Sequence, residues 1–143
     1  MVNRDLVATK LADLSDRVAR VRLHCPSNAA ALAASRDALD LVSFNLMLAV
    51  QTCADVASHL IADEGWPAAQ SLADGFQRLA EKGIISGGSA AALSRAVGLR
   101  NVVAHGYSGV DAALVHAAAT QGVADLDAFA REVAVWLGSR PQP

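Results

Sequence analysis

The segment RNVVAHGY, residues 100–107, holds three side chains that could do chemistry: Arg100, His105 and Tyr107. A histidine can accept or donate a proton and an arginine keeps its positive charge, so together they could support acid–base catalysis beside a fixed cation. The same residue types also suit the C-terminal end of a helix, where a cation interacts favourably with the helix dipole. Residue type alone leaves a reactive site and a polar helix end equally open.

Helical geometry decides which of these side chains can meet. Arg100 and His105 are separated by about 140° around an ideal helix, so they do not share a face. Asn101 and His105 are one turn apart and do share one, so Asn101 could orient the imidazole ring. If the helix ends just before His105, a turn at the following glycine brings His105 and Tyr107 toward the long Arg100 side chain.

A second polar group is predicted on another helix, where Asp55 precedes His59 by one turn. One interpretation is that both side chains face a cleft and orient either a substrate or His105. The other is a solvated face with an ordinary i,i+4 pair. The spacing would also allow a metal site with Asp63, but no further ligand lies nearby, and we predict no metal.

The elements that must position these residues are all predicted to be helices. Helical periodicity runs from end to end, and no window alternates in the manner of a strand. The fold class is therefore all-α, an antiparallel bundle of five to six helices, with one domain over residues 1–138 and a frayed tail at 139–143. Capping and turn residues place the helices at about 5–23, 27–63, 71–82, 89–105, 111–120 and 123–138.

The predicted helix over 27–63 is apolar on a wider face than one neighbour needs. Leu46 and Cys53 belong to one line of apolar residues with helical spacing, and Val50 and Ala57 belong to a second line beside it. Two packing partners are therefore implied. One could be the bundle core and the other a second copy of the chain, because most soluble oligomers are symmetric and a two-fold pair is commonest.

Composition limits the class of protein. The chain has 143 residues, 53% of them hydrophobic, which suits one globular domain. Its formal net charge of −2 disfavours a protein that coats nucleic acid through many basic contacts, so no DNA partner is expected. No apolar run approaches the roughly 20 residues that span a bilayer, and early charges disfavour a signal peptide, so we expect a cytoplasmic protein. Residues 75–110 carry four basic side chains against one acidic, which predicts a positive patch around Arg100.

The order of residues in RNVVAHGY resembles the RxxxxHxY signature of HepT-like toxins in the HEPN superfamily. Flanking stretches resemble the same family in the same order, from about residue 36 to 111: CADVASHLI at 53–61, the turn at Gly65, SLADGFQRLAEKGIIS at 71–86 and VGLRN at 97–101. The motif alone is short, but together with these flanks the resemblance is fairly specific.

This resemblance implies a HEPN domain that forms a homodimer, with the RxxxxH segments of two subunits in one cleft, and metal-independent endoribonuclease activity without a cofactor. Cleaving RNA in this way requires a base for the 2′-hydroxyl, an acid for the 5′-oxygen and a cation for the phosphorus. Two copies of His105 could divide the proton transfers, and Arg100 can grip phosphate in two places. The implied catalytic residues are thus Arg100 and His105, supported or oriented by Asn101, Asp55 and His59.

In the HepT-like family the partner is a minimal nucleotidyltransferase antitoxin that adenylylates the motif tyrosine. Carried to Tyr107, this implies a type VII-like toxin–antitoxin pair in which added AMP places phosphate beside Arg100, neutralises it and blocks the cleft. Gly106 departs from the family pattern, in which a bulkier or acidic residue often occupies this position, and the departure loosens the expected placement of Tyr107.

Two other classes of protein fit parts of the sequence. A non-catalytic HEPN module that binds and regulates a nucleotidyltransferase, or binds nucleotide, would share the fold and the motif. A histidine phosphotransfer bundle would also need one exposed histidine. That histidine should lie in mid-helix, however, and the glycine that follows His105 at a predicted helix end disfavours this class.

Overall fold

Seven α-helices and one π-helical turn make up the part of the chain that the computed structural model describes, residues 2–105 and 109–141. No strand occurs in these two ranges, so the predicted all-α class is confirmed. The predicted modification site, Tyr107, lies outside the described residues. In chain order the helices are α1 (Arg4–His24), α2 (Ala29–Ala34), α3 (Arg36–Asp63), α4 (Leu72–Glu81), α5 (Gly87–His105), α6 (Ala112–Ala117), the π-helical η1 (Ala118–Gly122) and α7 (Val123–Ser139).

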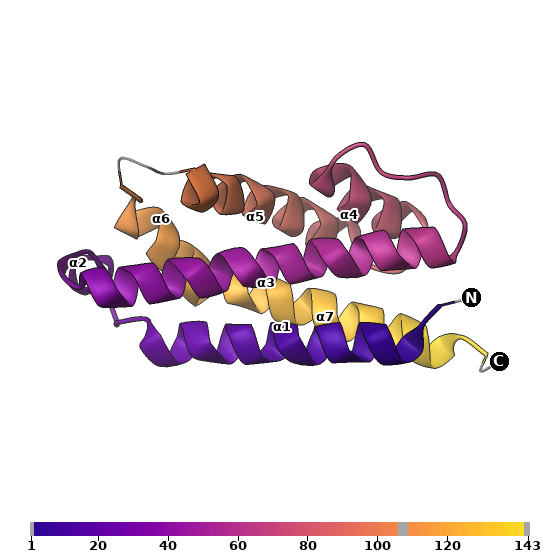
Figure 1. Ribbon diagram of the computed structural model, residues 1–143, viewed down its shortest axis with the longest axis horizontal. Coiled ribbons are helices and arrows are strands. Elements are labelled where there is room, and N and C mark those ends of the chain that lie inside the picture. Colours follow the sequence, from indigo (N-terminus) through magenta and orange to yellow (C-terminus); the bar gives the residue numbers. More distant parts are fainter. Residues whose placement is uncertain (1, 106–108, 142–143) are drawn as a thin grey trace.

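The central helix is α3, which has other helices on both sides (Figure 1). Helices α1 and α7 pack below it in this view, and α4 and α5 cover it from above. The short helices α2 and α6 lie together at one end of the bundle, where α5 also finishes. This arrangement places the C-terminal turns of α5 against the middle of α3, where Arg100 reaches Gln51.

Short polar side chains start five of the helices. Each one accepts a hydrogen bond from a backbone N–H in the first turn, which would otherwise lack a partner. The capping residues are Asn3, Asn28, Ser35, Ser71 and Asp111. Helix boundaries are therefore set by side-chain chemistry as well as by apolar spacing.

Two predicted boundaries are wrong. The single helix expected over 27–63 is divided at Ser35, whose backbone is extended (φ −115°, ψ 99°) and whose hydroxyl caps α3 instead of continuing α2. The break expected at Gly122 is absent, because that residue is helical (φ −66°) and α6 continues through η1 into α7. The chain after Asp111 is thus one bent helical rod rather than two separate helices.

Both apolar lines of α3 are buried within a single chain. Leu46 and Cys53 on one line are as inaccessible as Val50 and Ala57 on the other, because α1 and α7 cover one side and α4 and α5 the other. The inference that the second line faces another copy is therefore wrong. By length and composition α3 could also cross a membrane, but 56% of its most apolar window is buried inside the bundle, as expected for a core helix.

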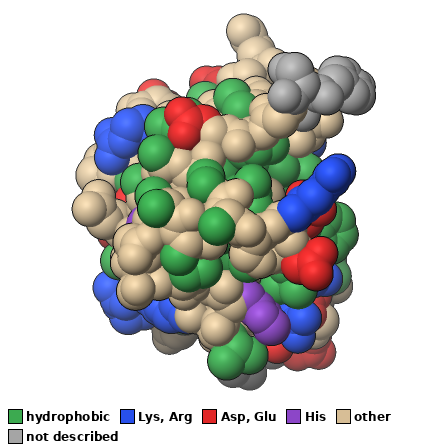
Figure 2. Space-filling view, turned by 90° about the vertical axis from the view of Figure 1, so that its left-hand side faces the viewer, with side chains coloured by type: hydrophobic (Ala, Val, Ile, Leu, Met, Phe, Trp, Pro, Cys, Tyr) green, Lys and Arg blue, Asp and Glu red, His purple; other side chains and the backbone are tan. Residues whose placement is uncertain are grey.

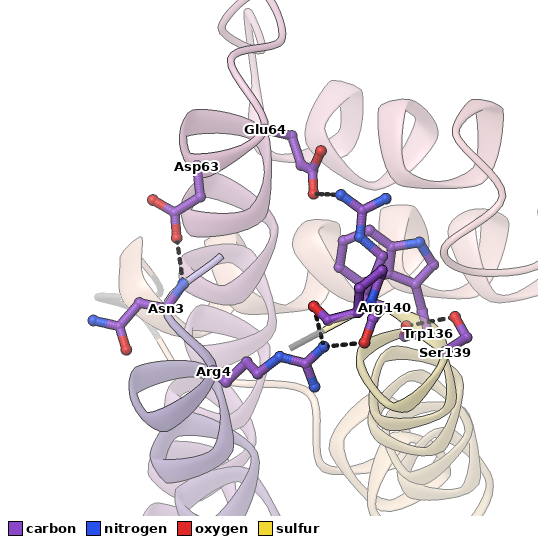
Figure 3. A network of polar contacts seen from close by, with 8 residues as sticks. Asn3, Arg4, Asp63, Glu64, Trp136, Ser139 and Arg140 are labelled. Carbon is purple, nitrogen blue, oxygen red and sulfur yellow. Dashed lines mark hydrogen bonds and ion pairs between the residues drawn. The ribbon is translucent and has the colours of Figure 1, made fainter. Parts of the chain in front are cut away.

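A polar network joins the two ends of the described chain, at the end of the bundle away from α2 (Figure 3). The guanidinium of Arg4 donates to the backbone carbonyl of Arg140. Arg140 in turn forms an ion pair with Glu64 at 2.5 Å, and its guanidinium lies 4.9 Å from the ring centre of Trp136. The first residues after α7 are therefore held against α1 and α3.

Candidate functional site

Arg100 lies on the C-terminal part of α5 and is held by two uncharged oxygen atoms. Its Nη2 donates to Oε1 of Gln51 on α3 at 2.8 Å, and its Nη1 donates to Oδ1 of Asn101 at 2.9 Å. Its Nε is buried and has no hydrogen-bond partner among the residues that the structure describes. The two terminal nitrogens therefore fix the position of the guanidinium, and no carboxylate neutralises it through a direct contact within the described chain.

Gln51 connects this arginine to a second charged pair. Its Nε2 donates to Oδ1 of Asp55 at 3.1 Å, and Nζ of Lys10 on α1 lies 3.7 Å from the other carboxylate oxygen. Three helices are thus tied together by polar side chains. Neither Gln51 nor Lys10 is predicted from the sequence, although Gln51 precedes Asp55 by one turn and so shares its helix face.

His105 is the last residue of α5, and its side chain is exposed. No hydrogen bond to it occurs within residues 2–105 and 109–141, and the residues that follow it, 106–108, lie outside the described chain. Oδ1 of Asn101, the predicted orienting group, accepts from Arg100. A helix end thus presents the histidine to solvent one and a half turns beyond the anchored arginine.

Asp55 and His59 do not form the i,i+4 pair that one interpretation expected. The carboxylate of Asp55 contacts Gln51 and Lys10, while His59 is half-buried and has no hydrogen bond in the described part of the chain. Of the predicted site residues, the structure therefore joins Arg100 to Asn101 directly and to Asp55 through Gln51. No three His, Cys, Asp or Glu side chains among the described residues are grouped closely enough to hold a metal ion.

Two of the four basic side chains expected to form a positive patch around Arg100 are engaged elsewhere. Arg78 donates to the carbonyl of Pro67 and pairs with Asp74, and the ammonium of Lys82 lies 5.0 Å from the ring centre of Trp66. These side chains belong to α4, near the end of α3 away from α2 (Figure 1). Arg78 and Lys82 thus act at α4, whereas Arg95 and Arg100 lie on α5.

A cleft lies near the C-terminal turns of α5 but is lined by residues other than Arg100 and His105. It has a volume of about 660 Å³ and lies between α5 and the rod formed by α6 and η1. Figure 2 shows the end of the bundle where α2 lies: hydrophobic and uncharged side chains fill most of the centre, and most charged side chains lie near the edge. The walls of the cleft are mainly apolar, with Leu46, Val50, Leu93, Leu99, Val102 and Leu114 among its lining residues.

Neither cysteine is suited to act as a nucleophile. Cys53 is fully buried on α3, and burial raises the pKa of its thiol far above the ordinary value. Burial also raises the pKa of Cys25, which is half-buried after α1. Because the thiolate is the reactive form of cysteine, a raised thiol pKa disfavours both residues as nucleophiles.

A family model and a curated protein match most of the chain. The family model described as "Ribonuclease HepT-like" matches residues 14–133. A curated relative, the mRNA nuclease HepT of Shewanella oneidensis, is 29% identical over 90 residues, which make up 63% of this chain and 68% of the relative.

Solved structures share the fold over almost the whole chain. A tri-AMPylated HEPN toxin of Shewanella oneidensis in complex with MNT antitoxin aligns with a TM-score of 0.85 and 23% identity, covering 92% of this chain and 98% of that one. YutE of Bacillus subtilis, described as a cytosolic protein of unknown function, aligns with a TM-score of 0.84 and 14% identity, covering 99% and 95%. The predicted HEPN-like helical bundle is therefore confirmed.

Proposed function

The chain belongs to the family of HepT-like ribonucleases, and from this premise we propose that it is a metal-independent endoribonuclease and the toxin of a toxin–antitoxin pair. The observation that carries the proposal is the anchored guanidinium of Arg100, which donates to Gln51 on α3 and to Asn101 on α5. Helix α5 also carries the exposed His105 as its last residue. RNA cleavage without a metal requires a cation and a proton-transfer group, and α5 carries one of each.

The reaction is a transesterification within the RNA backbone. The 2′-oxygen attacks the adjacent phosphorus, the bond from phosphorus to the 5′-oxygen breaks, and the products end in a 2′,3′-cyclic phosphate and a 5′-hydroxyl. One His105 accepts the proton of the 2′-hydroxyl, and the His105 of a second copy donates a proton to the departing 5′-oxygen. Arg100 stabilises the negative charge that develops on the phosphoryl oxygens.

A second copy is part of this proposal because one chain offers a single motif histidine, which is exposed at the end of α5. Leu46, Val50, Cys53 and Ala57 are buried within the chain, so we look for the contact with the second copy among exposed apolar residues. Phe44, two turns before Gln51 on α3, and Val102 on α5 are exposed by 51% and 46%. They leave apolar surface on the two helices that Arg100 joins, and we place the dimer contact there.

A minimal nucleotidyltransferase is the proposed antitoxin. It would transfer AMP from ATP to the hydroxyl of Tyr107, forming a bond from oxygen to phosphorus with release of pyrophosphate. The support is the family membership and the tri-AMPylated toxin in complex with MNT antitoxin, which shares this fold. The added phosphate would compete with RNA for Arg100. The toxin would cleave RNA in the cytoplasm when it is not modified.

The experiment compares His105→Ala with His24→Ala on total RNA, with and without EDTA. The two histidines are matched because each is the last residue of its helix, α5 and α1. We expect cleavage by the wild type and by His24→Ala in EDTA, and none by His105→Ala at an unchanged melting temperature. Cleavage by His105→Ala at the wild-type rate would refute the proposal. An inactive wild type that binds a nucleotidyltransferase tightly would instead identify a non-catalytic module.

A further inference from the structure

We infer that Gln51 is a positioning residue for Arg100, and that the neutral amide at this place on α3 leaves the charge of Arg100 available for a phosphate group. The inference rests on the proposed function, because it concerns the cation of the same site. It adds a residue that lies outside the RxxxxHxY motif and 49 positions before Arg100.

The orientation of the Gln51 amide is fixed by its two neighbours. The guanidinium of Arg100 has only donors, and the carboxylate of Asp55 has only acceptors. Oε1 must therefore face Arg100, at 2.8 Å, and Nε2 must face Asp55, at 3.1 Å. Lys10 holds the far oxygen of that carboxylate from α1, so the position of the guanidinium depends on groups from α1, α3 and α5.

The charge of the residue at position 51 determines whether the guanidinium of Arg100 is available to bind phosphate. A carboxylate here would form a charge-assisted and often bidentate pair with the guanidinium, which would offset its charge and compete with phosphate. The amide oxygen accepts one hydrogen bond without neutralising the cation. The nearby carboxylate, Asp55, is already shared by Gln51 and Lys10, so the group around Arg100 keeps a net positive charge.

A cation that is fixed before substrate arrives needs little reorganisation when charge develops in the transition state. Loss of its anchor should therefore lower kcat more than it raises KM, because the interaction grows stronger in the transition state than in the bound substrate. Neutralising the cation should in addition weaken binding of the substrate itself. A substitution that removes the hydrogen bond of Gln51 and one that places a carboxylate there can thus be distinguished by their effects on kcat and on substrate binding.

The test uses the full-length protein with Gln51→Leu and Gln51→Glu, and Gln77→Leu as the matched control on an exposed face of α4. The first measurement is the ¹⁵N NMR signal of Arg100 Nε, assigned by its loss in Arg100→Lys, which reports rotation of the guanidinium without any RNA. The second is single-turnover cleavage of an RNA oligonucleotide, and the third is binding of its non-cleavable 2′-deoxy analogue.

For Gln51→Leu we expect faster guanidinium rotation and a fall in kcat of about tenfold, the equivalent of one lost hydrogen bond to a charged group. For Gln51→Glu we expect slow rotation but at least tenfold weaker binding of the 2′-deoxy analogue. Gln77→Leu should match the wild type in all three measurements.

An unchanged Arg100 signal in Gln51→Leu would overturn the inference, and so would wild-type binding of the analogue by Gln51→Glu. If the wild type cleaves no RNA, the proposed function fails, and the NMR signal together with analogue binding still decides whether Gln51 positions Arg100.

Discussion

Arg100 and Gln51 are 49 residues apart in sequence and are joined by a hydrogen bond of 2.8 Å between α5 and α3. The cation of the motif is therefore placed by a helix that the motif does not include. Asn101, the next residue in the chain, supplies the second bond at 2.9 Å. The planar guanidinium is what allows one side chain to reach both oxygens and still face solvent with a positive charge.

Arg100→Lys should keep the charge but lose this geometry. An ammonium is a point charge that cannot span two acceptors and a phosphate as a planar fork does. We expect RNA cleavage to fall by roughly 10- to 100-fold, since one stabilising group in a transition state is worth a loss of this order or more. Single-turnover kinetics measures the cleavage rate, and circular dichroism checks that the variant keeps the helical fold. A rate within twofold of the wild type would show that charge alone suffices.

Glu132→Gln should lower stability at neutral pH and have less effect in acid. Partial burial alone would raise the pKa of Glu132, but hydrogen bonds from Ser89 and Ser86, with the charge of Arg131, hold it below its ordinary value. Because the folded-state pKa is lowered, the stabilisation is complete above the unfolded value of about 4.3 and is lost as pH falls through the folded value.

Urea unfolding at pH 7 and pH 3 measures this contribution. We expect Glu132→Gln to be about 1 kcal/mol less stable than the wild type at pH 7, with a smaller difference at pH 3, because acid favours the protonated carboxyl in the wild type. A difference that grows on acidification would contradict the assignment, because it would require a folded-state pKa above the unfolded one.

Gly83→Ala and Gly138→Ala should change stability in opposite directions. Gly83 ends α4 with φ +74°, so a Cβ there is strained although no atom lies within 4 Å of it. Gly138 lies inside α7 with equally open space around it. We expect a loss of about 1 kcal/mol for Gly83→Ala and a gain of up to about 1 kcal/mol for Gly138→Ala. Thermal melts of the two variants provide the measurement, and a common sign would refute the backbone argument.

Arg140→Ala should release the end of α7 at small cost. Its ion pair with Glu64 and its contact with the Trp136 ring lie at the surface, where such interactions contribute less than about 1 kcal/mol each. We expect a fall in the free energy of unfolding of that order and a change in tryptophan fluorescence. Lys82→Ala, which removes the equivalent contact on Trp66, is the control for fluorescence.

Apolar spacing predicted the all-α class and most helix positions because a bundle buries one stripe of each helix. It failed at Ser35, where a side chain that fits the interior of a helix caps the next helix instead. It also failed at Gly122, because a glycine permits a turn without requiring one, and η1 carries the chain through it. Both errors concern local hydrogen bonds that apolar periodicity does not record.

The sequence predicts the part of the site that lies within the segment 100–107. The positions of Arg100 and Asn101 on one helix follow from the motif, but their contact with Gln51 depends on how α5 packs on α3. The wide apolar face of α3 was misread for a similar reason. Spacing counts the partners that a helix needs, but it does not say whether they come from the same chain, and here the chain supplies both.

Local unfolding would affect the two halves of the site unequally. The last turn of α5 has few buried side chains: Asn101, Val102 and His105 are all exposed. Fraying this turn costs little free energy and displaces the histidine, whereas moving Arg100 breaks an interhelical hydrogen bond and leaves Oε1 of Gln51 without its donor. The proposed site thus combines a cation of high local stability with a histidine of low local stability, and a molecule bound at the end of α5 could displace the histidine without disturbing the core.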